Sequence, residues 1–466
     1  MRGPSTEKRK QLIERSALGP KSKALLLRAN EVESSANLYN QAFEEASPVI
    51  VKGKEATVWD LDGNEYIDLI SGFSVSNIGH CHPKIIEEIV RESSALFQYA
   101  EMPNVSRVDL AEQLLAIAPG SHRKKVFYTV TGGEAIEFAL KSARYYTNRP
   151  SIMGFKGAYH GRTYMAATVT NSAYMRYYQG FPLDMGVIHL PYAYCYRCAF
   201  GRSPDDCDME CTRYIEEHFK CNWYGVKFAT KDVEINNVAA IVVEPMQAAS
   251  GYITPPDQFL RDLRRITEEN ETLLIVDEIQ TGWGRTGRMW GCEHSGAEPD
   301  IMTVAKSIAG GLPLSATVAR EEIMDELGPA AHTTTFGGYN LACAVALRTI
   351  QVFKDEKLVE KAAATGDYFY KGLEDLMDEH PLIGNLEGKG KGLFIGIELV
   401  KDRKTKEPAA EENMRVQKEC CKRGVLYEKG GWYGNIIKII PPLVITQEQV
   451  DKVMEVFDDA LKAAEK

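Results

Sequence analysis

Short apolar runs alternate with amphipathic stretches along the middle of the chain. An unbroken apolar run bounded by turn residues is typical of a buried strand, whereas apolar positions at helical spacing predict a helix. Strands are expected at residues 124–130, 151–155, 238–244, 272–278 and 300–305, and helices at 134–146 and 257–270. Strands that are apolar throughout and alternate with helices favour a parallel sheet covered on both faces, so we predict an α/β fold.

The two ends of the chain differ from this middle. Residues 1–45 have a polar, helical pattern, and residues 56–72 form a β pattern around a turn signal at 62–64. Beyond about residue 345, amphipathic helices lead to further apolar segments and a closing helix. We expect three parts: an N-terminal arm with part of a small domain at 1–75, a large domain at 76–340 and a small α+β domain at 341–466.

Composition excludes two classes of partner. Hydrophobic residues make up 44% and charged residues 26% of the 466 positions, which is ordinary for a soluble globular protein. The net charge of −10 disfavours nucleic acid as a partner. No apolar run approaches the roughly 20 residues needed to cross a bilayer, so no membrane partner is expected.

The first 30 residues are basic, unlike the rest of the chain. They hold eight Lys/Arg and two Glu, which leaves a net charge of −16 on the remainder. A secretory signal needs an apolar core, which this segment lacks, and Glu7 and Glu14 count against an organelle transit peptide. We therefore expect a cytoplasmic protein with a solvated basic arm.

Four of the ten cysteines cluster at Cys195, Cys198, Cys207 and Cys211. The first pair has the CxxC spacing of half a zinc or iron–sulfur site, but the second pair is spaced more loosely than in a zinc ribbon. A loop of reduced thiols and a structural metal site both stay open, and we assign no metal. A disulfide framework is not expected in a long chain without an export signal.

A lysine directly follows the last of the predicted strands. Lys306 ends an apolar run and precedes a glycine-rich turn at 310–311. A buried lysine is costly unless it has a partner or a covalent role, and an amine can form a Schiff base with a carbonyl. Because ligands bind beyond the carboxyl ends of parallel strands, residues that follow the other strands should converge on Lys306.

Polar residues and glycines do follow the other predicted strands. Gly132 and Gly133 precede a helix whose free N–H groups suit a phosphate, although such a pair is more often only a turn. Asp277 is suited to holding a proton on a pyridinium ring, although a carboxylate at a strand end is often a cap or an ion-pair partner. Gln280 and Tyr159 could contact such a ring's oxygen and its face, although a lone tyrosine more often only packs.

The segment IVDEIQTGWGRTGRMWGCEHSGAEPDIMTVAKSIAGGLPLSA closely resembles the signature of the class III, or omega-type, pyridoxal-phosphate-dependent aminotransferases. Other blocks, such as TGGEAIEFALKSAR, YHGRTYMAA and VVEPMQAASGYITPP, resemble the family in the family's order over about residues 45–460. The block around the lysine is highly specific, whereas glycine–helix turns are not. The resemblance implies fold type I: a large domain with a mainly parallel seven-stranded sheet flanked by helices, plus a smaller α+β domain.

The resemblance also implies a cofactor and a set of residues that bind it. Lys306 would carry pyridoxal 5′-phosphate as a Schiff base and, once released, move a proton on the substrate, with Asp277 as partner of the ring nitrogen. The other cofactor-binding residues implied are Gly132, Gly133, Tyr159, Gln280 and Thr335. Thr335 matches a threonine that reaches the phosphate of the neighbouring subunit, which implies a homodimer, or a dimer of dimers, with its active site at the interface.

Three further residues are implied as substrate contacts. Glu244 matches a glutamate that pairs with a late arginine and releases it when a dicarboxylate binds, but Lys438 stands in the arginine's place. Because arginine grips a carboxylate through two parallel N–H bonds and lysine offers only a point charge, 2-oxoglutarate should be held less well. Arg162 matches a second position that binds a substrate carboxylate.

The leading interpretation is therefore a transaminase. It would move an amino group from an omega-amino acid such as 4-aminobutyrate, a beta-amino acid or an amine to a 2-oxo acid by a ping-pong mechanism. The family also includes racemases or epimerases, decarboxylating enzymes and phospho-lyases, and the cofactor residues do not separate these. A non-catalytic protein that keeps the fold is a third interpretation, which the joint presence of lysine, aspartate, glutamine and the glycine turn disfavours.

Overall fold

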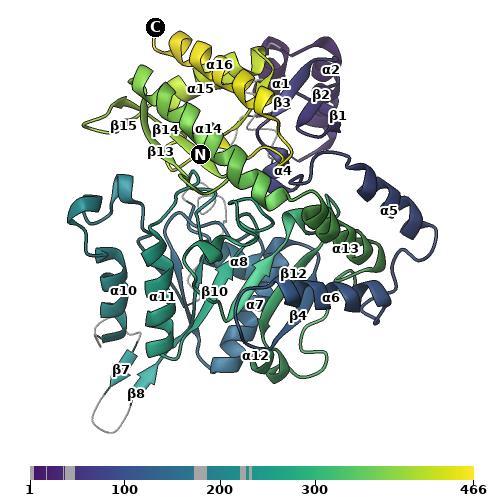
Figure 1. The fold of residues 1–466 in the computed structure, drawn as a ribbon, viewed down its shortest axis with the longest axis vertical. Coiled ribbons are helices and arrows are strands. Elements are labelled where there is room, and N and C mark those ends of the chain that lie inside the picture. The colour runs from purple at the N-terminus through teal and green to yellow at the C-terminus, as the bar shows by residue number, and fades with distance from the viewer. Residues whose placement is uncertain are drawn as a thin grey trace.

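The computed structural model describes residues 5–16, 18–34, 36, 48–172, 186–220, 227–229 and 234–466. Figure 1 shows a large lower part built around one sheet and a smaller upper part, where the first and last segments of the chain lie together. Among the described residues, no helix combines the length and the apolar character needed to cross a membrane.

A seven-stranded sheet forms the centre of the larger part. Its order is β4 (Lys124–Thr129), β12 (Ser315–Arg320), β11 (Ile301–Val304), β10 (Leu273–Asp277), β9 (Val238–Val243), β5 (Ser151–Phe155) and β6 (Val187–Leu190). Only β12 runs antiparallel to its neighbours, so the predicted mainly parallel sheet is confirmed. Every residue of β9, β10 and β11 is buried, as expected for strands covered on both faces.

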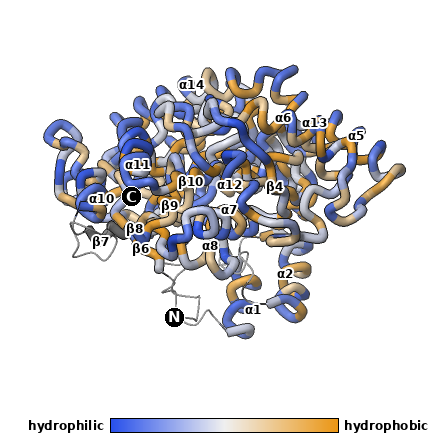
Figure 2. The backbone as a smooth tube through the Cα atoms, turned by 90° about the horizontal axis from the view of Figure 1, so that it is seen from below, coloured by the Kyte–Doolittle hydropathy of each residue, from blue (hydrophilic) through white to orange (hydrophobic). Residues whose placement is uncertain are grey.

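Helices cover both faces of this sheet, as Figure 2 shows from below. On one face lie α7 (Gly132–Thr147) and α8 (Tyr164–Val169), and on the other lies α11 (Asp257–Glu269). Among the described residues, this part also contains α6 (Val105–Ile117), α10 (Glu210–Lys220), α12 (Glu321–Glu326) and α13 (Asn340–Asp355). A small hairpin, β7 (Lys227–Ala229) with β8 (Glu234–Asn236), lies at the edge.

The smaller part is built from both ends of the chain. One sheet joins β1 (Ile50–Lys54), β2 (Thr57–Asp60), β3 (Glu65–Asp68) and β16 (Val425–Leu426). A second joins β13 (Ile383–Glu387), β14 (Ile395–Asp402), β18 (Ile436–Ile439) and β17 (Glu428–Gly430), with β15 (Glu407–Pro408) on β14. Their helices are α14 (Leu358–Glu379), α15 (Ala410–Lys422) and α16 (Gln447–Ala464). Because β16 pairs with β3, the N-terminal strands share a sheet with the C-terminal segment.

The N-terminal segment contains short helices before and after its strands: α1 (Thr6–Arg15), α2 (Pro20–Val32), α4 (Ser71–Ser74) and α5 (Pro83–Ser93). The helical pattern predicted for residues 1–45 is thus found over α1 and α2, while residues 37–45 lie outside the described residues. We propose to keep the division at residues 75 and 340, since the seven-stranded sheet lies wholly between them, although α13, which begins at residue 340, packs against α5 and α6 of the larger part.

Candidate active site

The carboxyl ends of the central strands surround a cavity of about 310 Å³. Seven of the residues singled out in the sequence line it: Gly132, Gly133, Tyr159, Glu244, Asp277, Gln280 and Lys306. They come from the segments that follow β4, β5, β9, β10 and β11, which are far apart in the chain. A second hollow, beside Arg144 and Arg149, has a volume of about 450 Å³ but carries none of these groups.

Lys306 follows β11 with a backbone φ of 47°, in the left-handed region that a side-chain-bearing residue rarely adopts. Its Nζ donates a hydrogen bond to Gln280 Oε1 at 2.5 Å. Burial lowers the pKa of this amine to about 8, although the nearby Asp277 and Glu244 carboxylates raise it in part. A neutral amine, which is the form that can act as a nucleophile or base, is therefore accessible near neutral pH.

Asp277 is held in a buried pair with a histidine that the sequence analysis missed. His160 Nδ1 lies 2.7 Å from Asp277 Oδ2, and both side chains are almost fully buried. Burial opposes a charge on His160, but the hydrogen bond and the charge of Asp277 outweigh it, and the pKa of His160 is raised. The other carboxylate oxygen accepts a hydrogen bond from the Ile279 N–H at 3.0 Å. The only sequence signal for His160 was its position next to Tyr159.

The turn before α7 leaves two N–H groups directed at a ligand-sized space. Thr131 Oγ1 accepts the Glu134 N–H, and the Glu134 carboxylate turns back to the Thr131 N–H, which together close a capping box. Gly132 and Gly133 occupy the next positions, whose N–H groups have no partner within a helix. A Cβ on Gly132 would lie 2.9 Å from Ile279 Cδ1, so a larger residue there would have to displace the Ile279 side chain.

Glu244 lies deep in the cavity and binds backbone rather than a cation. Its Oε1 accepts the Tyr159 N–H at 2.9 Å and its Oε2 accepts the Ala248 N–H at 3.0 Å. Burial raises the pKa of this carboxyl group to about 7, with His160 acting to lower it and Asp277 to raise it. No Lys or Arg forms an ion pair with Glu244 among the described residues.

Three of the predicted site residues do not line the cavity. Arg162 is exposed to solvent. Thr335 is also exposed, and its carbonyl accepts a hydrogen bond from Gln98 Nε2 at 2.7 Å. Lys438 is buried, but it pairs with Glu428 at 2.7 Å and not with Glu244.

The cysteine cluster lies outside this cavity. Cys195, Cys198 and Cys207 are partly buried, Cys211 is buried, and none is in a disulfide. Burial raises the pKa of the Cys195 thiol to about 11 and that of Cys211 to about 12. Within the described residues, no three of these sulfur atoms come within 4.8 Å of one another.

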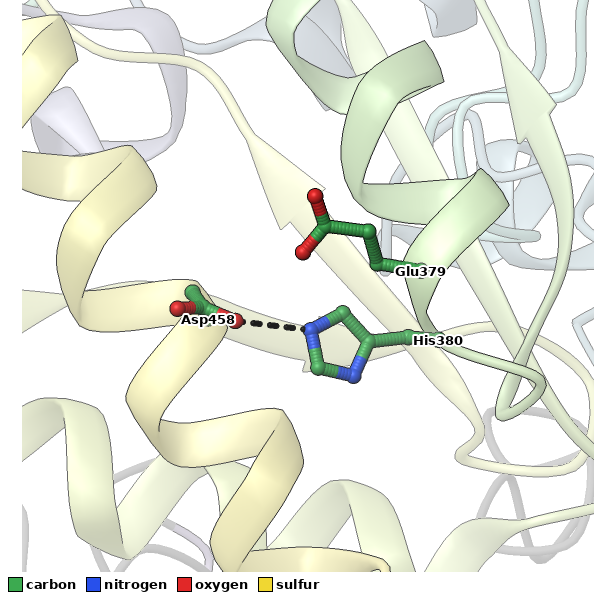
Figure 3. Close-up of side chains that lie close together, drawn as sticks. All are labelled: Glu379, His380 and Asp458. Carbon is green, nitrogen blue, oxygen red and sulfur yellow. Dashed lines mark hydrogen bonds and ion pairs between the residues drawn. The ribbon is translucent and has the colours of Figure 1, made fainter.

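Another group of possible metal ligands lies at the end of α14. The ligand atoms of Glu379, His380 and Asp458 lie within 4.8 Å of one another. Figure 3 shows these three side chains, with His380 in contact with Asp458. Both ring nitrogens of His380 are already used, by Asp458 at 3.0 Å and by Glu465 at 3.1 Å. The group is therefore accounted for as an ion-pair cluster that ties α14 to α16.

Known proteins similar in sequence cover most of the chain. Residues 39–461 match the aminotransferase class-III family. Leucine/methionine racemase from Thermococcus litoralis is 36% identical over 436 residues, which cover 92% of this chain and 95% of that protein. A 5-aminovalerate aminotransferase from Pseudomonas aeruginosa is 35% identical over 421 residues, covering 88% of this chain and 94% of that protein.

The fold is similar to that of ornithine aminotransferase from Toxoplasma gondii, whose crystals held pyridoxal phosphate at partial occupancy in the active site. The TM-score is 0.80 at 28% identity, over 100% of this chain and 99% of that one. Sequence and fold thus agree over nearly the whole length. The chain belongs to the class-III aminotransferase family, a family of enzymes that depend on pyridoxal 5′-phosphate.

Proposed function

We propose that the protein moves an amino group from an omega-amino acid, a beta-amino acid or an amine, as in 4-aminobutyrate, to a 2-oxo acid by a ping-pong mechanism. The observation that carries the proposal is Lys306: its amine points into the cavity formed by the strand ends, has a pKa lowered to about 8, and lies among Gln280, Asp277 and Glu244. The 5-aminovalerate aminotransferase among the relatives supports a donor whose amine is remote from its carboxylate.

The lining of the cavity fits pyridoxal 5′-phosphate. The N–H groups of Gly132 and Gly133, at the positive end of α7, would bind the phosphate. Asp277 would hold a proton on the ring nitrogen, Gln280 would contact the ring oxygen, and Tyr159 would lie against the ring. When bound, the cofactor supplies an aldehyde for the amino group and a ring that accepts the electron pair of a breaking bond.

The chain's own residues would then handle protons and charge. Lys306, as a neutral amine, would take a proton from the substrate's amine-bearing carbon and deliver it to the carbon that comes from the cofactor's aldehyde. His160 would fix the orientation of the Asp277 carboxylate, because its Nδ1 lies 2.7 Å from Asp277 Oδ2 and both side chains are almost fully buried. Because both groups are buried, water would have little access to a proton shared between Asp277 and the ring nitrogen.

We also propose that two copies of the chain form a homodimer and that Thr335 completes the partner's phosphate site. Thr335 is exposed and lies outside its own cavity, beside Gln98. Large apolar side chains are exposed at the adjacent Phe336 and along the segment 86–108, which contains Gln98: Ile86, Val90, Leu96, Phe97, Tyr99, Met102, Val105 and Val108. A surface of this kind is typical of a subunit interface. The cytoplasmic location stays a prediction.

A second candidate activity is racemisation or epimerisation of an amino acid. The relative that favours it is the leucine/methionine racemase, which is 36% identical over 92% of this chain. Lys306 would again remove the proton, but racemisation requires that a proton return to the opposite face of the same carbon.

One set of experiments tests both activities. Borohydride reduction of the purified holoenzyme followed by peptide mapping should give a cofactor adduct on Lys306. Amino donors are then incubated with pyruvate. Formation of alanine from pyruvate, together with the aldehyde or ketone left by the donor, supports transfer, whereas loss of optical rotation without any acceptor supports racemisation. An adduct on another lysine, or on none, contradicts both proposals.

A further inference from the structure

An ion pair on a small-domain hairpin lies within electrostatic reach of Lys306. Glu428 on β17 and Lys438 on β18 are directly opposite in the antiparallel register, with Lys438 Nζ 2.7 Å from Glu428 Oε2. The side chain of Lys438 is 6% exposed and that of Glu428 is 25% exposed. Gly430 makes room for the lysine stem, since a Cβ there would lie 2.9 Å from Lys438 Cδ and Cε.

The hairpin that carries the pair is fixed against the cavity. Trp432, in its turn, donates from Nε1 to Ser250 Oγ at 2.7 Å, and Ser250 donates to the Gly157 carbonyl at 2.8 Å. Gly157 is two residues before Tyr159, which lines the cavity. The Lys438 ammonium lies 5.2 Å from the ring centre of the buried Tyr252. Both charges of the pair act on the Lys306 amine, Lys438 lowering and Glu428 raising its pKa.

The pair changes what Lys438 offers to a substrate. A lysine next to a binding cavity would attract the distal carboxylate of a dicarboxylate. Here the ammonium is already neutralised by a carboxylate tethered on the adjacent strand. A dicarboxylate would have to separate a largely buried ion pair and leave Glu428 without its cation, which is costly. A substrate with an uncharged side chain leaves the pair intact.

We propose that Glu428 is a specificity-determining residue that holds Lys438 in a closed pair and so selects substrates lacking a second carboxylate. The inference rests on the proposed function and sharpens it: the 2-oxo acid acceptor is a monocarboxylate of the pyruvate class rather than 2-oxoglutarate. Neither partner alone sets this preference, because Lys438 without Glu428 would favour the opposite class.

The test compares two ligands that bind without turnover. Dissociation constants of glutarate, a dicarboxylate, and valerate, its five-carbon monocarboxylate counterpart, are measured by calorimetry on the holoenzyme. The wild type should bind glutarate no more tightly than valerate. In Glu428→Gln, glutarate should bind about tenfold more tightly, while the constant for valerate stays within about twofold. The double variant Glu428→Gln/Lys438→Met should lose this gain.

Two single variants complete the design. Glu407→Gln removes a carboxylate from an exposed pair with Lys401 at 2.8 Å, and should change neither constant. Lys438→Met should weaken glutarate binding by no more than about twofold, because the ammonium is not available in the wild type. If Glu428→Gln fails to fold, the glutarate constant of Lys438→Met still tests whether the ammonium is available to a dicarboxylate in the wild type.

Three results would overturn the proposal: an unchanged glutarate constant in Glu428→Gln, a gain that persists in the double variant, or a tenfold loss in Lys438→Met. Failure of the proposed transamination would appear separately, because no donor would then convert pyruvate into alanine.

Discussion

The buried position of Lys306 disfavours the charged form of its amine. Burial lowers the pKa of its amine from 10.5 to about 8, so the folded apoenzyme pays on the order of 3 kcal/mol to hold it charged at pH 7. Its left-handed backbone adds strain at the same residue. A structural lysine would have no reason to keep both properties, whereas a lysine that must be neutral to react needs the first of them.

Replacing this lysine should therefore stabilise the apoenzyme in a pH-dependent way. Between pH 8 and 10.5 the unfolded chain holds a proton on residue 306 that the folded chain has lost, so wild-type stability rises through this window. The free energy of unfolding of Lys306→Met should exceed that of the wild type by the largest amount below pH 8. This difference should shrink by on the order of 3 kcal/mol by pH 10.5. Urea unfolding of both apoenzymes from pH 7 to 10.5 measures it, and a constant difference would contradict the lowered pKa.

Glu244 should show the opposite dependence. Its pKa is raised from 4.5 to about 7, so between these values the folded chain holds a proton that the unfolded chain has lost, and stability falls as pH rises. The free energy of unfolding of Glu244→Gln should rise relative to that of the wild type by on the order of 3 kcal/mol between pH 4.5 and 7. Lost hydrogen bonds would shift the difference by the same amount at every pH and would not change this rise. Urea unfolding of the two apoenzymes at these pH values tests this, with the exposed Glu407→Gln as the flat control.

Residue-level prediction from the sequence succeeded where a residue follows a strand. Lys306, Asp277 and Glu244 line one cavity because the ends of neighbouring strands must meet. His160 was missed because nothing in a sequence tells a buried histidine with a carboxylate partner from one that only packs. The pairing of Lys438 with Glu428 was missed for a related reason: it depends on the register of two short strands, β17 and β18, which the apolar pattern does not fix.

At the scale of elements, the start of α7 is a part of the site where space for side chains is restricted. Its two glycines were found from the sequence, but the reason for glycine comes from the structure: a Cβ on Gly132 would lie 2.9 Å from Ile279 Cδ1. Ile279 is fixed in turn by its N–H bond to Asp277. The glycine turn and the strand end that carries Asp277 thus lie next to each other.

Gly132→Ala should weaken cofactor binding without unfolding the helix. Alanine is a better helix former than glycine, but its Cβ would displace Ile279 and widen the turn. We expect the dissociation constant of pyridoxal phosphate to rise about tenfold, measured by titration of the apoenzyme, with an unchanged far-ultraviolet circular dichroism spectrum. Gly328→Ala, where a Cβ meets nothing within 4 Å, is the matched control. Unaltered affinity in Gly132→Ala would show that the turn adapts.

For the whole molecule, the predicted strand and helix pattern was enough to foresee the mainly parallel sheet. It did not foresee how the ends of the chain are tied to it. The β16–β3 pairing joins residues more than 350 positions apart, and local periodicity carries no information about such a contact. A single buried side chain from the large part makes the same kind of connection, and it was not singled out from the sequence.

Arg285 is that side chain, and it should be essential for stability. It is fully buried and donates to Asn77 Oδ1 at 2.5 Å, and also to the carbonyls of Leu393 at 3.2 Å and Pro441 at 2.6 Å. One planar guanidinium thus links the central segment to both chain ends. Lysine keeps the charge but lacks the several N–H groups that the planar guanidinium presents, so some of these buried oxygens would be left without donors. Arg285→Lys should lower the free energy of unfolding by about 2–4 kcal/mol, whereas the exposed Arg288→Lys should leave it within about 0.5 kcal/mol. If thermal and urea unfolding found the two variants equally stable, the hydrogen bonds of Arg285 would not be needed to hold the two parts together.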